Sequence, residues 1–72
     1  MRISLKIKFN ASKERFEKFG DNKYLVYLPF EEDADSKAII AQMLSKKLGA
    51  PVSRIEFVAI EPITKNWVFE IR

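Results

Sequence analysis

One segment of this chain, residues 36–48, carries a complete helix signature, and a single helix limits what the other residues can build. Its apolar residues Ile40, Leu44 and Leu48 recur every four positions, so they share one helix face. The end of the helix is marked by two lysines, a glycine and a proline: Lys46, Lys47, Gly49 and Pro51. One apolar helix face covers one face of a sheet and leaves the other face to water.

Four other segments are predicted as strands: residues 2–9, 23–30, 54–60 and 67–72. Residues 2–9 alternate strictly between apolar and polar side chains, which is typical of a half-buried strand. Residues 23–30 are rich in aromatic and β-branched side chains. The last two segments are predicted to pair as a hairpin across the intervening loop.

Two local features bear on this strand prediction. Residues 10–20 fit a helix, a strand or a loop, and the sequence leaves this choice open. In the last hairpin we predict Phe57 opposite Ile71, so that Glu56 lies opposite Arg72. The same register turns three apolar side chains away from the helix: Val58, Ile60 and Val68.

The order strand–strand–helix–strand–strand predicts an α+β fold. The expected architecture is a two-layer sandwich in which one main helix packs on one face of a four-stranded mixed sheet. Residues 1–72 are predicted to form a single domain, because no linker, repeat or low-complexity segment interrupts them. A chain of this length buries about 60% of its unfolded surface, which suffices for one small core.

The chain has no cysteine and no histidine. Their absence excludes disulfides, thiol nucleophiles, cysteine–histidine zinc sites and histidine-based triads. Carboxylates gather before the helix, where they suit the positive end of its dipole: Glu31, Glu32, Asp33 and Asp35. A calcium loop would usually need a glycine among them. Ser36 next to Lys37 does not make a catalytic pair, because helix neighbours point about 100° apart. We therefore predict no metal, no cofactor and no enzymatic activity.

The location predicted from the sequence is cytoplasmic. No apolar run approaches the roughly 20 residues that a membrane-spanning helix needs. The first residues alternate in polarity and lack the apolar core of a secretory signal. The absence of cysteine is also consistent with a reducing compartment.

Thirteen basic and ten acidic residues give a net charge of +3, which permits weak attraction to a polyanion. The favoured function is a non-catalytic module that binds RNA or another polyanion. Its candidate residues are basic or hydroxyl-bearing: Lys6, Lys8, Lys37, Thr64 and Lys65. Lys6 and Lys8 share a sheet face with Tyr27, as in open-sheet platforms for single strands. Alternatively, this face is only solvated, with Glu56 and Glu70 pairing with the lysines.

Lys37 is the most unusual of these residues, because it falls on the apolar stripe of the predicted helix. In one interpretation its stem lies on the core while the ammonium group reaches water. In the other interpretation it binds an anion near the loop that contains Thr64 and Lys65. The sequence leaves both interpretations open.

The segments KIKFNASK (residues 6–13) and SKAIIAQMLSKKLGAPVSRIEFV (residues 36–58) carry a resemblance to a known family. The chain resembles the YggU-like family over nearly its whole length. The resemblance implies an α+β fold with a mixed sheet packed on helices, and it implies no established activity. At three family positions that are polar or glycine, this chain has apolar residues: Ile39, Ile60 and Trp67.

These apolar residues support an alternative function. Ile39, Met43, Ile60 and Trp67 are candidates for an exposed apolar patch that binds a protein partner or a second copy of the chain. If all four pack in the core, this alternative has no basis.

Overall fold

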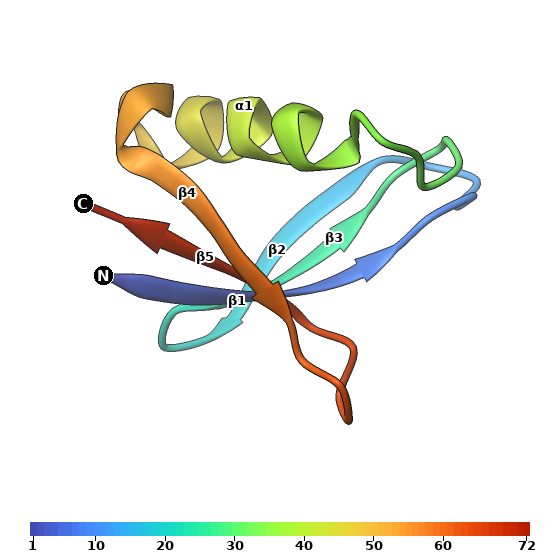
Figure 1. Cartoon of the computed structure of the whole chain (residues 1–72). Coiled ribbons are helices and arrows are strands. Elements are labelled where there is room, and N and C mark those ends of the chain that lie inside the picture. Colours follow the sequence, from blue (N-terminus) through green and yellow to red (C-terminus); the bar gives the residue numbers. More distant parts are fainter.

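The predicted helix is present: α1 spans Ser36–Leu48 in the computed structural model, which describes residues 1–72 (Figure 1). Gly49 follows it in the left-handed region, with φ of 72°, and its N–H donates to the carbonyl of Ser45. This is the geometry that the predicted stop signal requires. Neither α1 nor any other helix is both long enough and apolar enough to cross a membrane.

Five strands form one mixed sheet, whereas the prediction had four. Their bounds are β1 Arg2–Lys8, β2 Arg15–Gly20, β3 Lys23–Tyr27, β4 Ile55–Ile60 and β5 Trp67–Ile71. A short 3-10 helix, Val52–Arg54, leads into β4. The spatial order is β2-β3-β1-β5-β4, and β1 pairs parallel with β3 and antiparallel with β5 (Figure 1). The strand–strand–helix–strand–strand order was therefore wrong by one strand before the helix.

The additional strand, β2, lies in the segment that the sequence left open. It pairs antiparallel with β3 at the edge of the sheet. The register shifts between Lys18 and Gly20, which is the irregularity of a β-bulge. The two aromatic residues of the strand, Phe16 and Phe19, are consequently three positions apart. That spacing hides the period of two by which a strand is recognised.

The hydrophobic core lies between α1 and one face of the sheet, here called the covered face (Figure 1). Its buried apolar residues come from the helix and from every strand except β2, together with Leu28: Ile3, Leu5, Tyr24, Val26, Leu28, Ile40, Leu44, Ile55, Trp67 and Phe69. Rings pack in sequence along this face, with centroids 5.8 Å apart for Phe9 and Trp67, 5.6 Å for Trp67 and Phe57, and 5.5 Å for Phe57 and Phe69.

The β4–β5 hairpin forms, but its register differs from the prediction. Phe57 lies opposite Phe69 instead of Ile71. A second bulge lies at Val58, because the register shifts between Phe57 and Ala59. A strict period of two cannot anticipate this extra residue.

The bulge reverses the face of the residue that follows. Ile60 pairs with Trp67 and therefore shares the side of Trp67, not the side away from the helix that was predicted. Glu56 lies opposite Glu70, and it still forms an ion pair with Arg72, which is its diagonal neighbour.

Candidate functional site

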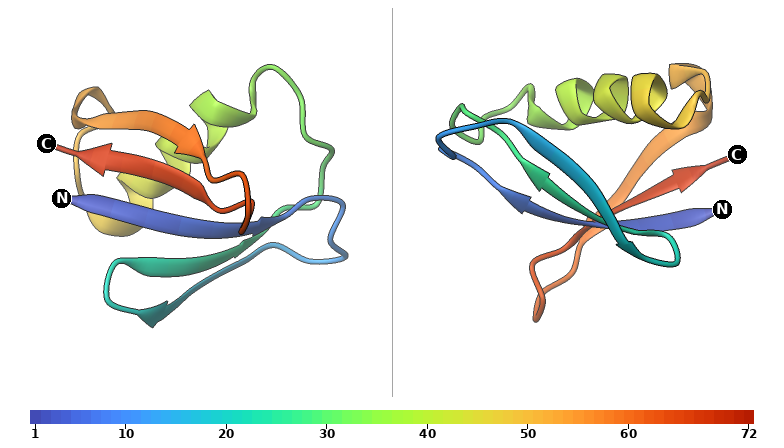
Figure 2. Two further views of the ribbon diagram at one scale, coloured as in Figure 1. Left: turned by 60° about the horizontal axis from the view of Figure 1, so that its bottom comes forward. Right: turned by 180° about the vertical axis from the view of Figure 1, so that it is seen from behind.

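The face of the sheet opposite α1, here called the open face, is not covered by any element of the chain (Figure 2). It presents the polar half of the alternation in β1, including Ser4, Lys6 and Lys8. The pairing of β3 with β1 places Lys23, Leu25 and Tyr27 beside these three residues in turn. Two neighbouring inner strands of the sheet thus expose three lysines around a leucine and a tyrosine.

Three carboxylates of the open face, those of Glu17, Glu56 and Glu70, pair with partners other than lysine. Glu17 pairs with Arg15 at 2.6 Å, and Glu56 pairs with Arg72. Glu56 and Glu70 lie on this face and form ion pairs there, as the alternative interpretation predicted, but their partners are Arg72 and Arg2 instead of Lys6 and Lys8. No lysine in the structure has its Nζ within 4.0 Å of a carboxylate oxygen.

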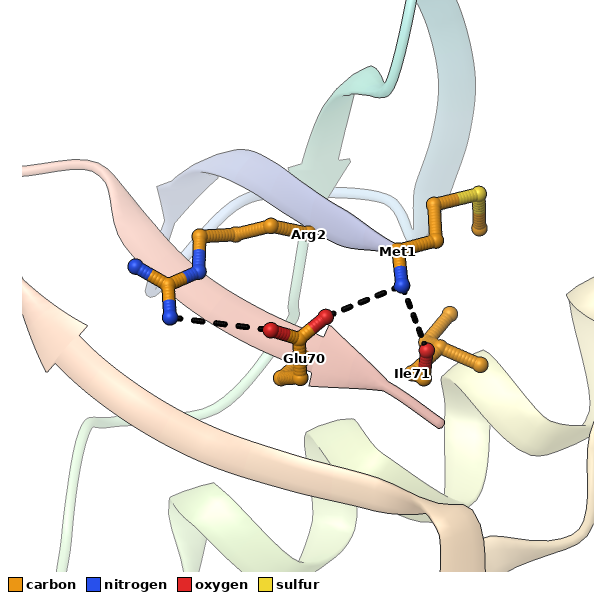
Figure 3. Close-up of polar contacts among 4 residues, drawn as sticks. All are labelled: Met1, Arg2, Glu70 and Ile71. Carbon is orange, nitrogen blue, oxygen red and sulfur yellow. Dashed lines mark hydrogen bonds and ion pairs between the residues drawn. The ribbon is translucent and has the colours of Figure 1, made fainter.

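Glu70 belongs to a polar cluster at one end of β1 (Figure 3). One carboxylate oxygen lies 3.0 Å from the ammonium group of Met1, and the other lies 3.6 Å from Arg2. The same ammonium group donates to the carbonyl of Ile71 at 2.7 Å. The hydrogen bond from this ammonium group is the main cause that lowers the pKa of Glu70, and the charges of the ammonium group and Arg2 add to it.

Lys6, Lys8 and Lys23, here called the lysine cluster, therefore keep their charges unpaired by carboxylates. Tyr27 lies within this positive field. Lys8 Nζ lies 5.7 Å from the centroid of its ring, and the guanidinium carbon of Arg15 lies 6.0 Å from it. These distances suit cation–π attraction, which holds the cations beside the ring without neutralising them.

A hollow of about 590 Å³ adjoins the lysine cluster on the open face and is here called the open-face hollow. Lys23 and Ser4 line it on the side of the cluster. The turn between β2 and β3 lines it as well, as do the bulged part of β4 and the start of the β4–β5 loop. Polar groups and apolar side chains contribute to the same wall, so the open face is not a uniformly charged surface.

Lys37 does not join the lysine cluster. It lies on α1, on the other side of the sheet, with its Nζ 4.4 Å from the centroid of the Phe57 ring. Phe57 packs against the core, so the lysine stem covers apolar surface while the residue itself stays exposed. The structure thus agrees with the interpretation in which the stem of Lys37 lies on the core while its ammonium group reaches water.

The loop with Thr64 and Lys65 extends on the side of the sheet away from α1 (Figures 1 and 2). Both residues are exposed, and Lys65 has a positive φ of 64°. The predicted group is thus divided: Lys6, Lys8 and this loop share the side opposite to Lys37.

The predicted apolar patch is also divided. Trp67 is 5% exposed and belongs to the core, which corrects its assignment to a surface: it pairs with Leu5 of the central strand. Met43 packs against the core, whereas Ile39 and Ile60 remain partly exposed on α1 and β4. Ile39 and Met43 line a groove of about 810 Å³ beside α1.

The acidic run before α1 forms a local turn. Asp33 accepts a hydrogen bond from the N–H of Asp35 at 2.8 Å, and the N–H of Asp33 donates to Ser36 Oγ at 2.9 Å. Nowhere do three or more acidic side chains lie close enough together to hold a metal ion.

The sequence and the structure of the chain were compared with known proteins, and no relative was found. No family model, no curated protein and no solved structure matches the chain. The resemblance to the YggU-like family stays a prediction.

Sequence reasoning missed Lys23, which completes the lysine cluster. The signal was present, because Lys23, Leu25 and Tyr27 alternate along a predicted strand and so share one face. What the sequence does not state is which strand lies next to which. The parallel pairing of β3 with β1 brings Lys23 beside Ser4.

Proposed function

We propose that this protein is a non-catalytic module that binds RNA or another polyanion on the open face of its sheet. The observation that carries this proposal is the lysine cluster: three lysines on two adjacent inner strands, none paired with a carboxylate. Such an array releases counterions when it contacts phosphates, so affinity falls with salt. Lys65 lies in a loop on the same side and adds to the field, whereas Lys37 does not contribute.

The test is a fluorescence-anisotropy titration of a labelled single-stranded RNA of mixed sequence, at low and at physiological salt. One variant replaces the lysine cluster with glutamine: Lys6→Gln, Lys8→Gln and Lys23→Gln. The matched control removes the same charge from α1: Lys37→Gln, Lys46→Gln and Lys47→Gln. All six residues are exposed, so both variants keep the core intact.

We expect salt-sensitive binding that weakens at least about tenfold in the cluster variant and about twofold in the control. The slope of log affinity against log salt falls by about 2 in the cluster variant, since each phosphate contact to a single strand contributes about 0.7. Equal losses in both variants would show that net charge alone acts, and no binding at low salt would refute the proposal.

The alternative of an apolar interface has weaker support. Trp67 is buried, and the exposed members Ile39 and Ile60 lie on different elements. A homodimer through these residues predicts a mass that rises with concentration in sedimentation equilibrium. We expect the mass of a monomer throughout.

A further inference from the structure

The open-face hollow lies at one end of the lysine cluster, and its chemistry differs from that of the cluster. Its apolar wall comes from Val58, Ala59 and Val68. It is an open hollow of about 590 Å³ on the surface, not an enclosed cavity. A polyanion bound to the lysines therefore passes an open hollow that offers apolar contact.

The charged groups of the hollow argue against a phosphate inside it. Asp21 and Glu61 both line the hollow, and both carry negative charge. Glu61 is oriented by Ser4, whose hydroxyl donates to its Oε1 at 3.4 Å, and no cation pairs with either carboxylate. The basic groups of the wall are Lys23, on the cluster side, and Arg2, which already pairs with Glu70.

The hollow requires a ligand group that contacts its apolar wall and that donates hydrogen bonds to its two carboxylates. A neutral group with N–H donors and apolar faces does both. Carboxylates accept hydrogen bonds from an exocyclic amino group, as acidic side chains do from cytosine N4. The amide of Asn22 adds both a donor and an acceptor to the same wall. Unpaired bases present such edges, whereas bases in a duplex have them occupied or stacked.

We propose that the ligand of the open face is a single-stranded nucleic acid, and that the open-face hollow takes one unpaired base with an exocyclic amino group. The lysine cluster binds the phosphates that lead away from that base on one side, along β1 and β3, and Tyr27 offers a ring on which a further base stacks. This inference rests on the proposed polyanion-binding function and specifies its ligand class.

The experiment compares three probes in the same titration: an oligocytidine, an oligouridine of equal length, and inorganic polyphosphate, which has the charge but no bases. A fully paired RNA duplex serves as the fourth probe. We expect the oligocytidine to bind at least about fivefold more tightly than the oligouridine and the duplex.

Two variants test the hollow itself. Ala59→Phe fills it from an exposed position without changing charge. Glu61→Gln removes one carboxylate and leaves the hollow open. We expect Ala59→Phe to weaken oligocytidine about tenfold while polyphosphate changes less than twofold. We expect Glu61→Gln to reduce the preference for oligocytidine over oligouridine, even though it makes the protein more basic.

The two proposals fail in different ways. If neither RNA nor polyphosphate binds at low salt, the polyanion function is refuted and this inference falls with it. If polyphosphate and all RNA probes bind alike and neither variant alters that order, the polyanion function stands and the inference is refuted. Tight duplex binding would also refute it. The Glu61→Gln result decides the matter should Ala59→Phe fail to fold.

Discussion

The two faces of the sheet are built from the same strands and carry opposite chemistry. On the covered face, Leu5, Val26 and Phe69 have no measurable exposure. On the open face, Lys6 lies one position from Leu5 in the chain and is exposed. The alternation of a strand therefore divides the molecule into one face that stabilises it and another that is free to bind.

This division follows from having only one helix. A second helix packed on the open face would bury it, and that face would then need apolar residues as well. Here the open face has charged residues on most strands. Glu17, Glu56 and Glu70 form ion pairs there, whereas Asp21 and Glu61 do not. Substitutions on the covered face should change stability, and those on the open face should change binding.

The largest expected effect comes from neighbouring residues of β5 that face opposite ways. Phe69→Ala removes a fully buried ring and is expected to lower the free energy of unfolding by about 3–5 kcal/mol. Val68→Ala, on the open face, is expected to lower it by less than about 1 kcal/mol, because it leaves no enclosed cavity. Urea denaturation followed by circular dichroism measures both. Equal losses would contradict the division between the faces.

A smaller effect, of opposite sign, is expected in the loop on the open side. Lys65 has a φ of 64°, which is unfavourable for a residue with a Cβ. Lys65→Gly relieves this strain and is expected to raise the free energy of unfolding by roughly 0.5–1 kcal/mol. Lys65→Gln, which removes the charge and keeps the Cβ, is the control and should leave stability unchanged. A gain in the control would assign the effect to charge.

Lys37 also tests the difference between the two faces, because it is a basic residue on the side of the covered face, where no binding is proposed. Lys37→Gln is expected to lower the free energy of unfolding by about 0.5–1 kcal/mol, since its ammonium group lies over the ring of Phe57. RNA affinity should change less than twofold. A tenfold loss of affinity would instead place the binding surface on the helix side.

The smallest effect concerns the pH dependence of the open face. The pKa of Glu70 is held below its ordinary value of 4.5, mainly by the Met1 ammonium group. A lowered pKa in the folded state stabilises the fold above pH 4.5, and this stabilisation is lost as pH falls through the folded-state value. Glu70→Gln should therefore be slightly less stable at pH 7 and lose less stability below pH 4.5. The measurement is the melting temperature of both proteins across this pH range. If the two melting temperatures changed in parallel with pH, the stabilising role of the Glu70 carboxylate would be contradicted.

The helix was predictable because its signals are local. Its apolar spacing, terminal lysines and Gly49 all lie within or next to the segment, and the observed bounds are those predicted. The strands were less predictable. In β2, the bulge between Lys18 and Gly20 breaks the alternation, and in β4 the bulge at Val58 turns Ile60 to the other side.

Only the part of the candidate site that follows from the alternation of side chains along one strand was predictable. Lys6 and Lys8 were assigned to one face correctly, because both lie on one uninterrupted strand. Lys23 and the open-face hollow depend on which strands are neighbours, and no residue of β1 encodes its pairing with β3. Lys37 was predicted as a candidate binding residue, but it lies outside the site. Its contact with the ring of Phe57, which lies twenty positions further along the chain, could not be predicted from its own segment.

The central position of β1 has a consequence for how this chain acquires its structure. β1 is the first strand of the sheet to be synthesised, whereas one of its two partners, β5, is the last strand of the sheet. At 5–20 residues per second, roughly 3–12 s separate the synthesis of these two strands. During that interval the apolar side of β1 lacks Trp67 and Phe69, so this side of the sheet cannot close until β5 has been synthesised. The strand order therefore makes the pairing of the first strand with the last a late event in the formation of the sheet.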